Sequence, residues 1–186
     1  MSRLAHRRAR LLRDRAASNL ASLAAVTILG LLPGQSRADD EDGLWSAVHG
    51  WPLITVHAAL TPDGRVLTYG TNGNGTQTGF FIYDVWDPEA GLTGGHITLD
   101  NMTLTDIFCS SQIILPQTGD ILIAGGDNWT GSGTTNTGNN NSNIFDYGDN
   151  TLARSANMHR ARWYSSSTAL LNGEIYIQGG SGGRDR

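Results

Sequence analysis

The feature that most constrains the fold is a strand–turn–strand unit that occurs three times at an even spacing. The turn glycines of the three units are Gly64, Gly119 and Gly173, which are 55 and 54 residues apart. The segments that align on these glycines are TPDGRVLTYGT (61–71), PQTGDILIAGG (116–126) and LLNGEIYIQGG (170–180). Such a period indicates repeated supersecondary units that bury their faces against one another.

Each unit begins with an apolar strand and reaches paired glycines at or near the end of its second strand. The first strands are ITVHAAL (54–60), CSSQIIL (109–115) and YSSSTAL (164–170), and the first two units continue into FFIYDVWDP (80–88) and SNIFDYG (142–148). A β repeat of about 50 residues with a Gly-Gly pair in this place is typical of a kelch-type β-propeller blade. The alternative is three unrelated hairpins that share turn chemistry.

The repeat predicts an all-β fold of about three kelch-type blades, in units near 54–100, 109–150 and 164–186. Glycine suits the inner end of a blade because a side chain there would block the approach of neighbouring backbones. Propellers close with about 4–8 blades, so three units predict an incomplete propeller. We therefore expect residues 39–186 to be a partial propeller domain, either the N-terminal portion of a longer protein or a chain that needs a partner to complete it.

The first 38 residues differ in composition from the rest and predict an export signal segment, residues 1–38. They contain seven arginines and one acidic residue, whereas the remainder contains six arginines and sixteen acidic residues. The apolar run 20–32 is 13 residues long, and a bilayer span needs about 20. Ser36 and Ala38 are small residues that suit cleavage after Ala38. An uncleaved anchoring helix is the alternative.

Export and charge together restrict the partners of the chain. The expected location is extracellular, periplasmic or in the cell envelope, with no stable membrane span after cleavage. The stretch HRRARLL (6–12) loosely matches a twin-arginine signal, which leaves the export route open. The acidic body argues against nucleic acid as a partner, because phosphate neutralisation needs clustered cations.

Cys109 is the only cysteine of the chain. In an exported protein a lone cysteine is buried, bonded to another chain or chemically employed. Cys109 lies ten residues before Gly119, and Tyr164 lies nine residues before Gly173, so neighbouring blades are expected to bring a thiol and a phenol together near the propeller axis. Taken singly, each residue is more simply interpreted as a packed side chain.

These segments resemble the copper radical oxidase family, the galactose oxidase and glyoxal oxidase group. The residues that carry the resemblance are DIFCSSQIILPQTGDILIAGGDN (106–128) and MHRARWYSSSTALLNGEIYIQGGS (158–181), within a similarity over about residues 44–183. The ARWY form is more similar to the glyoxal oxidase branch. Both motifs occur at equivalent places in successive units, which makes their combination specific.

The resemblance implies a function for the thiol and the phenol. It implies that Cys109 and Tyr164 join in a thioether, that Tyr164 binds one copper ion and stores an electron hole as a radical, and that a small primary alcohol or aldehyde, carbohydrates included, is oxidised by O2 with release of H2O2. Arg162 and Trp163 would lie beside this site, where we prefer a structural role for both.

The sequence also departs from the family, whose copper is held as well by a second tyrosine and two histidines from later segments. We expect His57 to be packed in its strand and His159 to be solvated, so no histidine is assigned to copper. The chain by itself is therefore expected to be inactive. The alternative function is a non-catalytic kelch-repeat module that binds a glycan or a protein, and a third possibility is a gene remnant that does not fold stably.

We predict that the exported protein begins at Asp39, because SRA (36–38) precedes an acidic run. N-terminal sequencing of secreted material measures this directly. Mature protein that starts at Met1, or a product retained entirely in membranes, would contradict the prediction.

Overall fold

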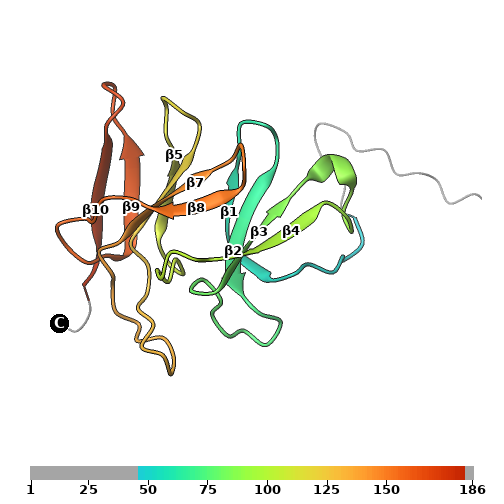
Figure 1. Ribbon diagram of the computed structural model, residues 1–186, viewed down its shortest axis with the longest axis horizontal. Coiled ribbons are helices and arrows are strands. Elements are labelled where there is room, and N and C mark those ends of the chain that lie inside the picture. Colours follow the sequence, from blue (N-terminus) through green and yellow to red (C-terminus); the bar gives the residue numbers. More distant parts are fainter. Residues whose placement is uncertain (1–45, 183–186) are drawn as a thin grey trace, which may run out of the picture. The chain divides into compact units, whose positions relative to one another are not determined.

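The computed structural model describes residues 46–182 (Figure 1), so the predicted signal segment lies outside the described residues. The first sheet contains β1 (Ile54–Leu60), β2 (Val66–Thr71), β3 (Ile82–Trp86) and β4 (His96–Asp100), in the order β1-β2-β3-β4, with a short 3-10 helix, η1 (Pro88–Ala90), before β4. The second sheet has the same antiparallel order in β5 (Ser111–Ile114), β6 (Ile121–Ala124), β7 (Ser142–Asp146) and β8 (Thr151–Arg154). The third is a hairpin of β9 (Trp163–Ala169) and β10 (Ile175–Ser181).

The predicted all-β architecture of about three blades in a partial propeller is confirmed. The outermost strands of the first two blades, β4 and β8, are additions to the sequence prediction. Both are four or five residues long and mostly exposed. Short strands with little burial lack the apolar alternation by which strands are found in a sequence, which explains why they were not predicted.

The three predicted turns have the same backbone conformation. Gly64, Gly119 and Gly173 have φ angles of 87°, 83° and 84°, a region that glycine enters without steric cost. Each glycine follows the first strand of its hairpin, and β1 pairs with β2 from Leu60↔Val66 up to Ile54↔Thr71, with a bulge between Thr55 and His57. The glycine that recurs in the sequence therefore marks the same tight turn in each of the three hairpins.

The main hydrophobic core lies between the first two sheets. Its buried side chains are Leu67, Tyr69, Tyr83, Val85, Ile107, Ile121, Ile123 and Phe145. The core residues lie at every second position of their strands, Leu67 and Tyr69 on β2 and Ile121 and Ile123 on β6. Polar side chains also join the sheets, since the hydroxyl of Tyr83 donates to the carbonyl of Asn150 at 2.8 Å. Blades one and two therefore form one packed unit.

The second and third blades approach each other through backbone and small side chains. A Cβ on Gly125 would lie 2.2 Å from the carbonyl oxygen of Arg162, and one on Gly126 would lie 2.1 Å from that of Asp106. The N–H of Gly126 donates to the Arg162 carbonyl at 3.0 Å. The predicted reason for the Gly-Gly pair, close approach of neighbouring backbones, thus applies at this junction.

The two long loops of the fold leave the sheets at one end. The loop that follows β2 and the loop that follows β6 extend opposite to the tight turns that close the three hairpins (Figure 1). The segment that precedes β5 lies at the loop end too, because Gly79 packs against the backbone of Phe108. Between residues 46 and 182, no helix has the length and apolar character of a membrane span.

The blade junction gives a stability prediction. We expect Gly125→Ala to destabilise the fold by roughly 3 kcal/mol or more, because the new Cβ must displace the backbone of Arg162 and also occupy a positive φ. Gly64→Ala is the matched control: its φ is also positive, but no atom lies within 4 Å of the added Cβ, so only about 1–2 kcal/mol is expected. Urea unfolding of the two variants measures both values, and equal losses would contradict the prediction.

Candidate functional site: the thiol–phenol pair at the inner blade ends

Cys109 and Tyr164 occupy equivalent places in the second and third blades. Cys109 precedes β5 by two residues, and Tyr164 is the second residue of β9. Both have left-handed backbone conformations, with φ angles of 59° and 60°. This conformation costs a non-glycine residue of order 1–3 kcal/mol and is concentrated at functional sites. The shared strain supports the equivalence that the turn spacing predicted.

The two residues contact each other across the blade junction. The backbone N–H of Tyr164 donates to the carbonyl of Cys109 at 3.0 Å. Hydrogen bonding between the two side chains raises the pKa of the Tyr164 phenol, while burial raises the pKa of the Cys109 thiol. The thiol is 2% exposed and the phenol residue 63% exposed. The pair thus has a buried sulfur and a phenol open to solvent or to a ligand.

Trp163 places its indole beside the phenol. The ring centroids of Trp163 and Tyr164 are 4.7 Å apart, with 43° between the ring planes. The indole nitrogen of Trp163 is buried. Burial raises the pKa of the Cys109 thiol, and hydrogen bonding from the Trp163 side chain acts in the opposite direction. Trp163 therefore contributes both packing and a polar N–H next to the pair.

Arg162 joins the second and third blades through its backbone, and its guanidinium group bonds within the third blade. Its N–H donates to the carbonyl of Asn139 at 2.8 Å, its own carbonyl accepts from Gly126, and its side chain donates to the carbonyl of Gly179. These bonds support the structural role that the sequence analysis preferred. Within residues 46–182, the guanidinium forms no ion pair.

His57, on β1, supports the segment that carries the thiol. Its Nε2 accepts from the backbone N–H of Cys109 at 3.1 Å, and its ring stacks on Tyr69 with centroids 4.6 Å apart. Burial lowers the pKa of His57, which favours the neutral imidazole that this hydrogen bond requires. Because its Nε2 accepts this hydrogen bond, His57 is a packed side chain that supports the backbone segment of Cys109.

The remaining described histidines lie elsewhere. His96 bonds to Asp84 with 2.7 Å between Nδ1 and Oδ2, and its ring packs against Trp51. His159 is exposed. In the part of the chain that the structure describes, no group of three or more His, Cys, Asp or Glu side chains is arranged to hold a metal ion. Tyr164 is the one predicted copper ligand here, and a single phenol is not a copper site.

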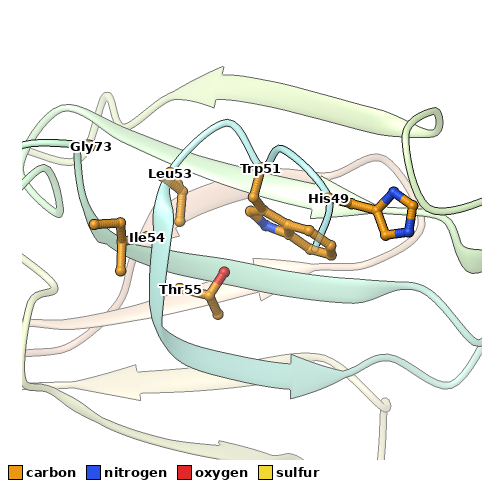
Figure 2. Close-up of a pocket in the computed structure, with 6 residues that line it drawn as sticks. All are labelled: His49, Trp51, Leu53, Ile54, Thr55 and Gly73. Atoms are coloured by element: carbon orange, nitrogen blue, oxygen red, sulfur yellow. The ribbon is translucent and has the colours of Figure 1, made fainter. Parts of the chain in front are cut away.

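A pocket lies near the start of β1 (Figure 2). Its volume is about 410 Å³, and its lining residues are His49, Trp51, Leu53, Ile54, Thr55 and Gly73. Neither Cys109 nor Tyr164 lines it. The pocket combines one indole and one imidazole with aliphatic side chains, and nothing in it brings together the groups of the predicted reaction.

Sequence reasoning missed two buried carboxyl groups close to the pair. Asp106 lies three residues before Cys109, and Asp127 directly follows the Gly-Gly pair. They are 2% and 0% exposed. Burial raises the pKa of Asp106 to about 6, and the charge of Asp127 adds to this rise. A signal was present in the sequence, since an acidic residue at each inner strand end is unusual beside buried apolar strands.

Comparisons with known proteins agree with this architecture. No protein-family model matches the chain. Two galactose oxidases from Gibberella zeae are each 26% identical to it over 144 residues, which is 75% of this chain and 19% of each relative. A solved fungal alcohol oxidase of the AA5 family, in complex with copper, matches with a TM-score of 0.54 at 20% identity, over 74% of this chain and 28% of that protein.

The described fold is a partial β-propeller with a thiol–phenol pair between two blades. The chain is similar to galactose oxidases over three quarters of its length, which agrees with the resemblance that the sequence motifs carry. It spans about a fifth of the length of the galactose oxidases that it matches.

The support from His57 gives a pH prediction. Burial lowers the pKa of His57 in the folded chain. As the pH falls, the unfolded chain therefore takes up a proton at a higher pH than the folded chain does. The free energy of unfolding consequently decreases as the pH drops below about 6.5. His57→Phe keeps an aromatic ring on Tyr69 but cannot bind a proton. We expect this variant to be less stable by about 1–3 kcal/mol at pH 7.5, because the N–H of Cys109 loses its acceptor.

Urea unfolding at about pH 7.5 and 5.5, on either side of the ordinary histidine pKa, tests this prediction. The difference in the free energy of unfolding between the unmodified chain and His57→Phe should be smaller at the lower pH. Asp106 titrates in the same window with the opposite sign, but it is present in both proteins and cancels in the difference. A gap that is constant or widens on acidification would show that His57 is not held neutral by the fold.

Proposed function

We propose that the chain is the N-terminal portion of an exported copper radical oxidase that oxidises primary alcohols or aldehydes with O2. The observation that carries the proposal is the contact between Cys109 and Tyr164, whose backbones are hydrogen-bonded at 3.0 Å and whose side chains interact. The likeness to galactose oxidases and to a fungal alcohol oxidase supports the same chemistry. Residues 39–186 contain six arginines against sixteen acidic residues, and this acidic balance fits a small neutral substrate better than nucleic acid.

Residues of this chain would supply an oxidisable organic group. The proposed thioether forms when the sulfur of Cys109 bonds to a ring carbon of Tyr164. The thiol and the ring each lose one hydrogen, and O2 accepts the two electrons and two protons as H2O2. A sulfur-substituted phenol is easier to oxidise than an unsubstituted one, so the crosslinked Tyr164 could hold one of the two oxidising equivalents that the alcohol requires.

Copper, when bound, supplies the other one-electron oxidising equivalent. Tyr164 is the residue that would bind it, through an exposed phenol that can lose its proton to a metal. The described residues do not complete a ligand set, and imidazoles are the ligands that suit copper best among those missing. We therefore propose that residues 46–182 provide one ligand, that other parts of the complete protein provide the rest, and that this portion alone does not turn over substrate.

Trp163 and the buried sulfur would protect the oxidised phenol. The indole lies 4.7 Å from the Tyr164 ring, so it shields one side of that ring from water. His57 and Arg162 would hold the two backbone segments that present the pair. The proposed substrates are small primary alcohols or aldehydes, carbohydrates included, and export would place the enzyme where such compounds are met outside the cytoplasm.

A second candidate function is a non-catalytic module that binds a glycan or a protein. One observation favours it: Phe80, Phe81 and Trp129 form a partly exposed aromatic cluster on the two long loops. The ring centroids are 5.3 Å apart for Phe80–Phe81, 5.8 Å for Phe80–Trp129 and 4.8 Å for Phe81–Trp129. Stacked aromatic rings of this kind are frequent where a protein contacts a partner.

The test that separates the two functions is a search for the crosslink. Protein made from the complete gene product is loaded with copper under O2 and digested with trypsin. We expect one product in which the peptide of Cys109 is joined to the peptide of Tyr164, with a mass lower than their sum by two hydrogens. The product should survive a reducing agent, which a disulfide would not.

Matched variants complete this test. Cys109→Gly should abolish the crosslinked peptide, raise the potential needed to oxidise the tyrosine and reduce peroxide production by at least tenfold, which corresponds to about 1.4 kcal/mol of transition-state stabilisation. Tyr176→Phe, which removes an exposed phenol on β10, should leave the crosslink unchanged. A free, alkylatable Cys109 in copper-treated complete protein would refute the oxidase and leave the binding module as the better interpretation.

A further inference from the structure

Two buried carboxylic acids, Asp106 and Asp127, lie on neighbouring backbone segments at the loop end of the second blade. The N–H of Asp127 donates to the carbonyl of Phe108 at 2.9 Å. The side-chain amide of Asn139 donates to the carbonyls of both aspartates, at 3.1 Å and 2.6 Å. Gly126 allows the two segments to meet, because any side chain at this position would overlap the backbone of Asp106.

Each carboxyl group has one satisfied and one unsatisfied oxygen. Oδ1 of Asp106 accepts from the N–H of Phe108 at 3.1 Å. Oδ1 of Asp127 accepts from the N–H groups of Asn128 and Thr137, at 2.7 Å and 3.1 Å. Both Oδ2 atoms are buried and have no hydrogen-bond partner among the residues that the structure describes. A buried oxygen without a partner costs of order 1–3 kcal/mol, and more when it is charged.

No cation of the described residues neutralises the two groups. The nearby titratable and charged side chains are Cys109, Tyr164, His57, Arg162 and Arg154. Both arginines are engaged elsewhere, Arg162 with the Gly179 carbonyl and Arg154 with Thr105 and Asn157. His57 uses Nε2 as an acceptor. Among residues 46–182 the ion pairs are Asp63–Arg65 and Asp84–His96, so neither buried aspartate is paired.

We propose that Asp106 and Asp127 form a carboxyl pair that holds one proton in mildly acidic solution and releases it as the pH approaches neutrality. Two like charges in a buried site disfavour double ionisation, and one retained proton removes one of them. The proton also gives an unsatisfied Oδ2 atom an O–H donor in place of a bare charge. The site is thus a proton-binding site adjacent to the thiol–phenol pair.

The electrostatics of the neighbouring groups agree with this assignment. Burial raises the pKa of Asp106 to about 6, and the charge of Asp127 raises it further. The charges of Asp106 and Asp127 raise the pKa of Cys109, and that of Asp127 raises the pKa of Tyr164. Loss of the proton therefore adds negative charge beside both side chains, whether or not they become crosslinked, so the inference is independent of the proposed oxidase function.

A purely structural role is the competing explanation. Both Oδ1 atoms order local loops, and Asp127 fixes the start of the long loop after β6 through Asn128 and Thr137. An asparagine could accept the same hydrogen bonds through its own Oδ1 but carries no charge. Asp127→Asn therefore separates the two roles, because it preserves the loop contacts and removes the like charge that acts on Asp106.

The experiment is a pH titration of the full chain, labelled with ¹³C at the aspartate carboxyl carbons and followed by NMR. The Asp106 signal is assigned by its loss in Asp106→Asn. We expect its midpoint near 6. Asp127→Asn should lower the Asp106 midpoint by about one pH unit. Asp63→Asn, an exposed carboxyl variant in a turn of the first blade, should leave it unchanged.

Three results would overturn the proposal. The first is an Asp106 midpoint near the ordinary value of about 4 in the unmodified chain. The second is a midpoint that Asp127→Asn does not move. The third is a midpoint that CaCl2 lowers and a chelator restores, since the pair would then hold a cation in place of a proton. If Asp127→Asn does not fold, the Asp106 midpoint in the unmodified chain decides the matter: a value near 6 supports the proposal, and the ordinary value of about 4 refutes it.

Discussion

The close backbone contact between Gly126 and the carbonyl groups of Asp106 and Arg162 is the constraint on which the site depends. The Gly126 N–H donates to Arg162 at 3.0 Å, and any side chain at Gly126 would overlap Asp106. This contact fixes the inner end of the third blade against the second. The hydrogen bond from Tyr164 to Cys109 lies along the same junction. The thiol and the phenol therefore meet because Gly125 and Gly126, which have no side chains, let the backbone of the second blade contact the Arg162 carbonyl of the third.

The same junction concentrates features that cost stability. Cys109 and Tyr164 have left-handed backbones, and within residues 46–182 two buried aspartates each have one side-chain oxygen without a hydrogen-bond partner. A fold tolerates such costs only where surrounding packing compensates for them, and here the core between the first two sheets provides that packing. The first blade contributes directly through His57, which accepts from the Cys109 backbone. The site is thus supported by all three blades.

Strain and unsatisfied groups at one place are a pattern of functional sites rather than of ordinary blade junctions. The chain is similar to galactose oxidases, and at this junction a thiol lies beside a phenol. The proposed carboxyl pair lies at the same junction, and its charge acts on the side chains of Cys109 and Tyr164. Redox chemistry at Tyr164 and proton binding at Asp106 would then share one electrostatic environment.

The sequence by itself determined the repeat, its turns and the equivalence of Cys109 with Tyr164, because turn glycines and apolar strands are local signals that recur at a fixed spacing. It also indicated the family, through motifs at matching places in two units. Only the tertiary structure decided that His57 bonds to the Cys109 backbone, that Asp106 and Asp127 are buried together, and that β4 and β8 complete two sheets. These features arise from contacts between residues distant in sequence or from short exposed strands, and neither leaves a periodic pattern in the chain.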